Sequence, residues 1–139
     1  MIRSIKLLEN IFDSLKLIDH ISCKLYRLYN AAFGRFPDYD GIKYWLEKNT
    51  RGEETYRETA ALFVESKEFK NLYSTDSNDD EKYLTSLYQN TLGRNPDHDG
   101  FNYWKNQLSK GFENRHEILM GFSESTEHKT IFSEETTIF

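Results

Sequence analysis

The segment 95–100, Asn-Pro-Asp-His-Asp-Gly, has the spacing in this sequence that is closest to a metal site. It places side-chain oxygens at alternate positions before a glycine, as in the first half of an EF-hand calcium loop, at Asn95, Asp97 and Asp99. The complete loop needs a glutamate at its twelfth position, where this chain has Asn106. The related segment 36–47 ends in a glutamate but begins with Phe36, which has no ligand oxygen. We therefore favour helix-capping carboxylates, with calcium kept as an alternative.

Two arginines, Arg35 and Arg94, each stand two residues before a Pro-Asp pair. A guanidinium suits bidentate binding of a carboxylate or phosphate, so both are candidates for an anion clamp. A simpler role is structural, because an arginine just beyond a helix end can bind the last carbonyls of that helix or pair with the aspartate of the next turn. We expect the structural role.

Aromatic residues gather around the same segments and could form a stacking surface for sugar rings or a peptide groove. They are Tyr39, Tyr44, Trp45, Phe101, Tyr103 and Trp104. However, a tryptophan at helical spacing from other apolar residues more often belongs to the core, with its N–H bonded to one partner. We favour the core interpretation and keep glycan binding as the alternative.

The remaining reactive residues form no catalytic pattern. Histidines occur at positions 20, 98, 116 and 128, and of these only His98 lies beside carboxylates in the sequence. The sequence contains no glycine-rich phosphate loop, zinc-ligand spacing or nucleophile motif. The single cysteine, Cys23, cannot form an internal disulfide, and its apolar helical surroundings predict a small buried residue. We expect no enzymatic activity and no cofactor other than the calcium alternative.

Charge and hydropathy argue against two classes of partner. The 139-residue chain carries a net charge of -5 and has no basic stripe, so we expect no nucleic-acid partner. It has no apolar run long enough to span a membrane. Charged residues interrupt the apolar positions of residues 1–20, which excludes a signal peptide there. The expected location is therefore cytoplasmic by default, or a virion or cell surface if export follows another route.

An internal repeat organises the chain, because residues 25–73 align without a gap with residues 84–132. The matching residues are Gly34, Arg35, Pro37, Asp38, Gly41, Tyr44 and Trp45 in the first copy and Gly93, Arg94, Pro96, Asp97, Gly100, Tyr103 and Trp104 in the second. Apolar residues recur at helical spacing, and the glycine and proline positions mark helix ends. Alternating strand patterns are absent from the sequence. We predict that each copy consists of several short helices.

The predicted fold is all-α, with two tandem helical repeats packed as one compact bundle and an extra N-terminal helix docked on the first repeat. The predicted units are an amphipathic helix over 1–24, repeat 1 over 25–73, an acidic linker over 74–82, repeat 2 over 83–132 and a tail over 133–139. In the first unit, Ile5, Leu8, Phe12 and Leu15 follow helical spacing. Their apolar face either covers the core or recruits a partner.

In these motif residues, the repeat resembles the bacterial family called domain of unknown function 4214. The family pattern has Gly-Arg, then Pro-Asp, Gly, Tyr-Trp and a later Phe-x-x-Ser-x-Glu-Phe, and the first copy matches its end at Ser66, Glu68 and Phe69. The second copy departs there, with His128 in place of the aromatic residue. The repeat is also distantly similar to the linker domains of cyanobacterial phycobilisomes. Both resemblances imply scaffolding or attachment.

We therefore expect a non-enzymatic structural or protein-interaction module, a scaffold or attachment subunit of a virion, cell-surface or linker-like assembly. Protein partners or self-association are expected, and glycan binding and a calcium-stabilised extracellular module are the alternatives. Contacts should come from the N-terminal helix, from the C-terminal tail and from residues that differ between the copies, namely Phe36, Tyr39, Ile42, Asn95, His98 and Phe101.

Overall fold

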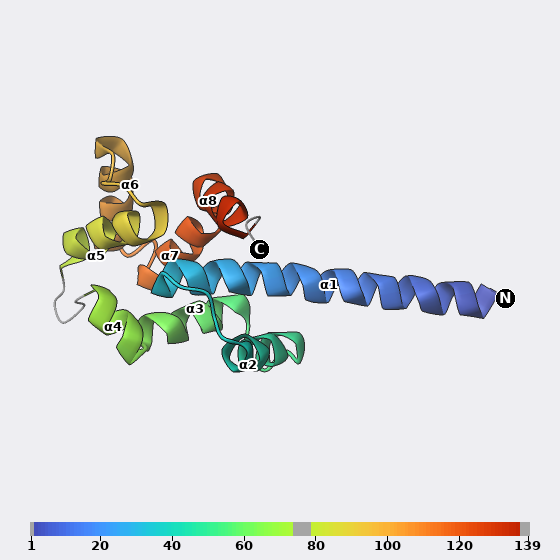
Figure 1. The fold of residues 1–139 in the computed structure, drawn as a ribbon. Coiled ribbons are helices and arrows are strands. Elements are labelled where there is room, and N and C mark those ends of the chain that lie inside the picture. Colours follow the sequence, from blue (N-terminus) through green and yellow to red (C-terminus); the bar gives the residue numbers. More distant parts are fainter. Residues whose placement is uncertain (1, 74–78, 137–139) are drawn as a thin grey trace.

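The computed structural model describes residues 2–73 and 79–136, and these residues contain helices and no strands. Figure 1 shows the helices packed as one bundle from which α1 projects. Their bounds are α1 Ile2–Phe33, α2 Tyr39–Thr50, α3 Tyr56–Glu65, α4 Lys67–Tyr73, α5 Asp80–Leu87, the π-helical turn η1 Tyr88–Leu92, α6 His98–Ser109, α7 Arg115–Ser123 and α8 Thr126–Thr136. The predicted all-α fold is confirmed. No helix in the described ranges has the length and apolar character that crossing a membrane requires.

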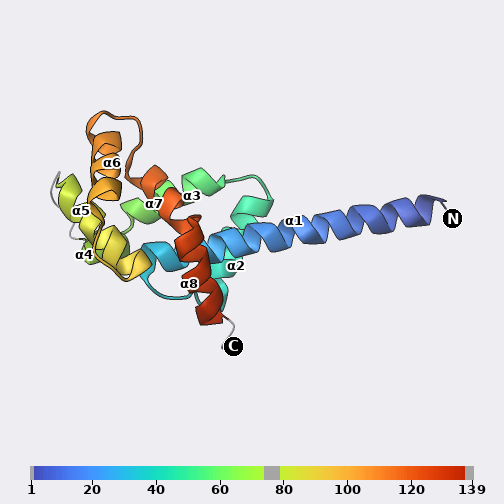
Figure 2. The same ribbon diagram turned by 90° about the horizontal axis from the view of Figure 1, so that it is seen from above.

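Helix α1 differs from the prediction of a separate, docked N-terminal helix. It runs through 32 residues without a break, so the expected boundary between residues 24 and 25 lies inside it. Figures 1 and 2, viewed at right angles, both show its N-terminal half extending away from the bundle. The physical reason is that residues 20–28 hold neither glycine nor proline, so nothing ends the helix before Gly34.

Cys23 is exposed, contrary to the prediction that it is buried. Leu25, two positions later in α1, is only 1% exposed. Neighbouring positions along a helix point in different directions, so the face that buries Leu25 leaves Cys23 toward solvent. The apolar stretch around the cysteine therefore did not decide which face it occupies.

The two repeats use the same local signals to shape their helices. Gly34 and Gly93 end the first helix of each repeat with φ of 67° and 65°, a left-handed conformation that a β-carbon disfavours. Asp38 and Asp97 cap α2 and α6, with the prolines one residue outside the caps. Capping boxes begin α3 at Thr55 and α7 at Asn114. These matching ends fix where each helix begins and stops.

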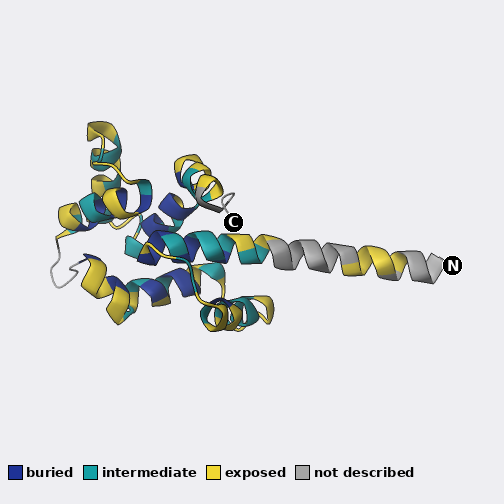
Figure 3. Ribbon diagram, viewed as in Figure 1, coloured by how far each residue is buried: buried dark blue, intermediate teal, exposed yellow. Residues whose placement is uncertain are grey.

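The core lies where the two repeats meet, and α3 packs directly against α7 at its centre. Figure 3 shows buried stretches of α1, α3 and α7 in the middle of the bundle. The fully buried apolar residues include Leu28, Ala60, Phe69, Leu84, Leu87, Ile118 and Leu119. Because side chains of both copies share one cluster, the repeats form a single cooperative unit rather than two independent domains.

Helices extend into the predicted acidic linker and into the predicted C-terminal tail. Residues 80–82 of the expected acidic linker begin α5, which Asp79 caps by accepting a bond from the Lys82 N–H, whereas residues 74–78 lie outside the described part. Residues 133–136 of the expected tail continue α8, and 137–139 again lie outside the described part. Carboxylates in a first helical turn favour the helix, so the acidity of 79–81 supports α5.

Candidate binding site

Each motif arginine forms a bidentate ion pair with a glutamate from the last helix of its own repeat. The Arg35 Nε and Nη2 donate to the Glu68 carboxylate oxygens at 2.9 and 3.0 Å. Arg94 makes the same pair of bonds to Glu127 at 2.8 and 3.1 Å. The bond to the turn aspartate that the sequence predicts is present at Arg94, but the glutamate partners were not predicted. The signal was present, because the arginine and the glutamate recur together at the same spacing in both copies.

The third nitrogen of each guanidinium is also engaged. Arg94 Nη1 donates to the Asn95 carbonyl oxygen at 3.1 Å and to Asp97 Oδ1 at 3.2 Å, and Arg35 Nη1 points to the Phe36 carbonyl oxygen at 3.5 Å. The hydrogen bonds to Glu127 raise the pKa of Arg94 above its ordinary value. The anion that each clamp holds is therefore a carboxylate of the chain itself.

The oxygens considered for calcium are directed to different partners. Asp97 accepts from the Gly100 N–H at 2.9 Å, and this backbone bond, followed by the Arg94 bond, lowers the pKa of the Asp97 carboxyl. Asn95 Oδ1 accepts from Gln89 at 2.9 Å, and Asp99 is exposed in the first turn of α6. Across residues 2–73 and 79–136 no three His, Cys, Asp or Glu residues come together in a way that could hold a metal ion.

The Tyr-Trp pairs divide between solvent and core. Tyr44 and Tyr103 are 51% and 53% exposed, whereas the tryptophans next to them are half-buried and pack against the core. The Trp45 ring lies 5.1 Å from Phe63 and the Trp104 ring 5.6 Å from Phe122. Each tryptophan therefore anchors its helix to the third helix of the same repeat.

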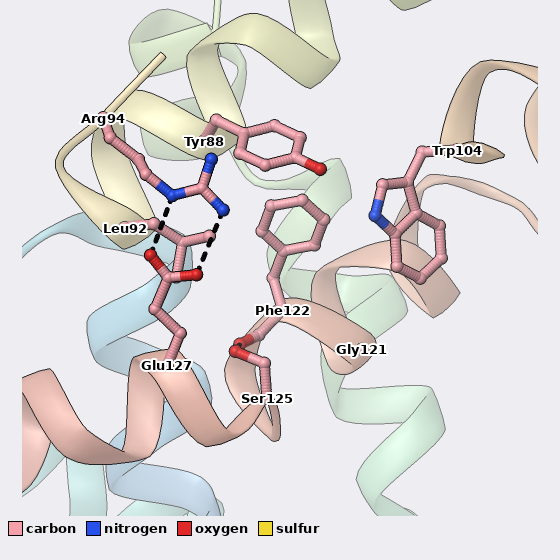
Figure 4. A pocket seen from close by; sticks show the side chains of 8 residues that line it. All are labelled: Tyr88, Leu92, Arg94, Trp104, Gly121, Phe122, Ser125 and Glu127. Carbon is pink, nitrogen blue, oxygen red and sulfur yellow. Dashed lines mark hydrogen bonds and ion pairs between the residues drawn. The ribbon is translucent and has the colours of Figure 1, made fainter. Parts of the chain in front are cut away.

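A pocket of about 170 Å³ lies beside Trp104 in repeat 2. Figure 4 shows its walls, which come from η1, α6, α7 and α8 and the turn that holds Arg94. The lining residues are Tyr88, Leu92, Arg94, Trp104, Gly121, Phe122, Ser125 and Glu127. Sequence analysis named only Arg94 and Trp104 among them as site residues. The equivalent positions in repeat 1 are identical except that Phe33 and Leu62 replace Leu92 and Gly121.

The residues expected to make contacts differ in how far they are exposed. Ile42 is buried at 7% exposure, which contradicts its assignment as a contact residue. Phe36 is half-buried, with its ring 5.8 Å from Phe132, and Phe101 packs against the core. Tyr39 is 75% exposed, and His98 is exposed with Nε2 3.2 Å from Asn102 Nδ2. Buried apolar area at Ile42 therefore stabilises the fold rather than offering a contact.

Two residues that sequence reasoning did not assign to the repeat interface connect α1 to the end of repeat 2. His128 is fully buried, with Nδ1 2.8 Å from the Ser123 carbonyl oxygen and Nε2 3.2 Å from Asn30 Oδ1. Glu124 accepts bonds from Arg27 Nε at 3.2 Å and Nη2 at 3.1 Å. The sequence did hold a signal for this contact, because His128 stands where repeat 1 has Phe69, and a polar residue in place of an aromatic one indicates different neighbours.

The tandem repeat matches a known protein family. Domain of unknown function DUF4214 matches residues 25–73 and residues 60–132. The chain belongs to the DUF4214 family. No curated protein and no solved structure matches the chain. The family description assigns no activity, so the DUF4214 match identifies the tandem repeat but not its role. The similarity to phycobilisome linkers stays a prediction.

Proposed function

We propose that this DUF4214 protein is a non-enzymatic structural subunit that self-associates through the projecting half of α1. The observation that supports this proposal most is the exposure of large apolar residues on that half. Leu8 is 64% and Ile11 48% exposed, although both lie within a regular helix. Figure 3 shows this part of α1 as exposed where its residues are described. Apolar residues exposed together on a helix are typical of an interaction surface.

The helical pattern of α1 continues from the bundle into the projecting half. Steps of three and four residues lead from Leu8 and Ile11 through positions 15 and 18, then past the polar Ser22, to the buried Leu25 and Tyr29. Leu25 and Tyr29 are buried inside the bundle, whereas Figure 2 shows no other described helix beside the part of α1 that carries Leu8 and Ile11. Most helical stability comes from packing of an amphipathic face, so a partner helix would stabilise the projecting half.

The charge distribution favours a second copy as that partner. Residues 1–20 contain three basic side chains and three acidic ones, Arg3, Lys6, Lys16, Glu9, Asp13 and Asp19, which sum to zero. The net charge of -5 therefore belongs entirely to residues 21–139. Two acidic bodies repel each other, so neutral helices that project away from them are where two copies meet at the lowest electrostatic cost.

The test is the molar mass in solution, measured by light scattering over a range of concentrations. We expect a dimer or higher oligomer for the wild type and a monomer for Leu8→Glu with Ile11→Glu. A control with the same charge change is Lys43→Gln with Lys110→Gln, at an exposed position of α2 and at the exposed residue that follows α6, and it should associate like the wild type. A wild type that stays monomeric at every soluble concentration would contradict self-association and leave a helix of another protein as the partner to seek.

A further inference from the structure

The pocket beside Trp104 lies where two otherwise closely matched repeats differ in sequence. Six of its eight lining positions carry the same residue in repeat 1. At the other two positions the side chain in repeat 2 is the smaller one. Leu92 stands where repeat 1 has Phe33, and Gly121 stands where it has Leu62. Two smaller side chains at one place leave more open space than the larger residues of repeat 1 would leave there.

Gly121 matters most, because its missing side chain borders the indole. A β-carbon at this position would lie 3.3 Å from Trp104 Cη2, so even a methyl group would press on the ring. The remaining walls are aromatic, with the Tyr88 and Phe122 rings edge-to-face at 4.8 Å and the Trp104 ring 5.6 Å from Phe122. Figure 4 shows these rings around one space, with the backbone of Gly121 at its edge.

The polar groups around the pocket already have partners inside the chain. Arg94 and Glu127 bond each other, and Ser125 Oγ donates to the Phe122 carbonyl oxygen at 2.7 Å and accepts from the His128 N–H at 3.1 Å. Burial raises the pKa of the Tyr88 phenol, and a hydrogen bond with Trp104 partly offsets that rise. A ligand with many hydroxyl groups would have to compete with these internal bonds and would lose its own bonds to water.

We infer that this pocket binds one apolar, phenyl-sized side chain of a protein partner. Its size suits that group, since a cavity on the order of 150 Å³ accommodates benzene in another protein. Aromatic walls favour an aromatic guest through edge-to-face contacts. This binding site goes beyond the association through α1, because it lies on the opposite repeat and uses none of the α1 residues.

The experiment follows the two indole N–H signals by NMR while N-acetylphenylalaninamide is added. We expect the Trp104 signal to shift and saturate, while the Trp45 signal stays in place as an internal control. Gly121→Leu restores the repeat 1 residue, and we expect it to weaken binding by at least about tenfold. Asn71→Leu adds the same side chain at an exposed position of α4, and it should bind like the wild type.

Three outcomes would overturn the inference. The first is an unshifted Trp104 signal up to the solubility limit of the probe, and the second is equal affinity in the wild type and Gly121→Leu. The third is saturable binding of methyl glucoside without binding of the phenylalanine probe, which would indicate a sugar site instead. If Gly121→Leu loses its helical circular dichroism, Gly121→Ala supplies the comparison, because its β-carbon already reaches the indole.

Discussion

The two DUF4214 repeats keep the same internal bonds and differ in what surrounds them. Both have the Arg–Glu clamp, the aspartate cap and the Trp–Phe contact at the same positions. Repeat 1 begins with a helix that projects far beyond the bundle, whereas repeat 2 begins with a short helix that ends in a π-helical turn. Repeat 2 alone has Gly121 beside its tryptophan and His128 at the interface. The comparison teaches that the clamps and caps build the fold, while function must be sought where the repeats diverge.

The largest loss of stability is expected from shortening a buried leucine, and comparing the two repeats shows whether they contribute equally to the core. Leu28 and Leu87 occupy equivalent positions, and both are fully buried. We expect Leu28→Ala and Leu87→Ala each to lower the free energy of unfolding by about 2–5 kcal/mol, measured by urea denaturation. A loss near zero in one variant beside a large loss in the other would mean that only one repeat forms the shared core.

The next effect concerns the ion pair that has no counterpart in the other repeat. Arg27 is replaced by Ser86 at the equivalent position, and its side chain is only 15% exposed where it meets Glu124. We expect Arg27→Met to lower the free energy of unfolding by about 1.5–3 kcal/mol, because a partly buried hydrogen bond between charged groups is lost. Arg35→Met removes an exposed pair and should lower it by about 0–1 kcal/mol in the same urea experiment. Equal losses would contradict the difference in burial.

The same ion pair predicts a pH dependence. Burial alone would raise the pKa of Glu124, but hydrogen bonds and charge from Arg27, with Lys129 and Lys24, outweigh it and hold that pKa below its ordinary value. The folded protein therefore binds this proton less readily than the unfolded chain, so the stabilisation is complete well above pH 4.5 and is lost as pH falls below it. We expect the stability difference between the wild type and Arg27→Met to shrink on acidification. A difference that does not change with pH would argue against this pair as its source.

A smaller effect concerns the histidine that replaces an aromatic residue of repeat 1. His128→Phe inserts the repeat 1 residue but leaves the Ser123 carbonyl without its ring partner, and we expect a loss of about 1–3 kcal/mol on thermal unfolding. The reverse change, Phe69→His, places a polar ring where Phe69 stacks on Tyr73 at 4.1 Å, and should also destabilise. If His128→Phe stabilised the protein, the interface would not depend on these hydrogen bonds.

The smallest expected effect is that of calcium. Asp97 and Asn95 already accept bonds from Gly100, Arg94 and Gln89, so calcium would have to displace them. We expect the melting temperature to stay unchanged when calcium replaces a chelator, as ligand binding would raise it. A rise with calcium that the chelator reverses would restore the EF-hand interpretation of the segment 95–100.

Much of the fold was predictable because its signals are local. The glycine, proline and aspartate of each motif mark helix ends within a few residues, and helical periodicity indicates the buried face. The length of α1 was not predictable, because the repeat alignment imposes a boundary at residue 25 that the backbone does not need. The pairing of Arg94 with Glu127 joins segments distant in sequence, and the pocket depends on a small residue, Gly121, that has no chemistry of its own. Such long-range features arise from packing.

The unbroken course of α1 has a geometric consequence for any assembly built on it. Each residue of an α-helix advances about 1.5 Å and turns about 100°. Because the projecting half of α1 continues without a break into the bundle, the number of residues between the two sets both the distance and the rotation of the bundle relative to a partner bound to the projecting half. A single residue inserted in α1 would rotate the whole bundle about the axis of α1. Seven inserted residues would nearly restore its orientation but place it farther from that partner.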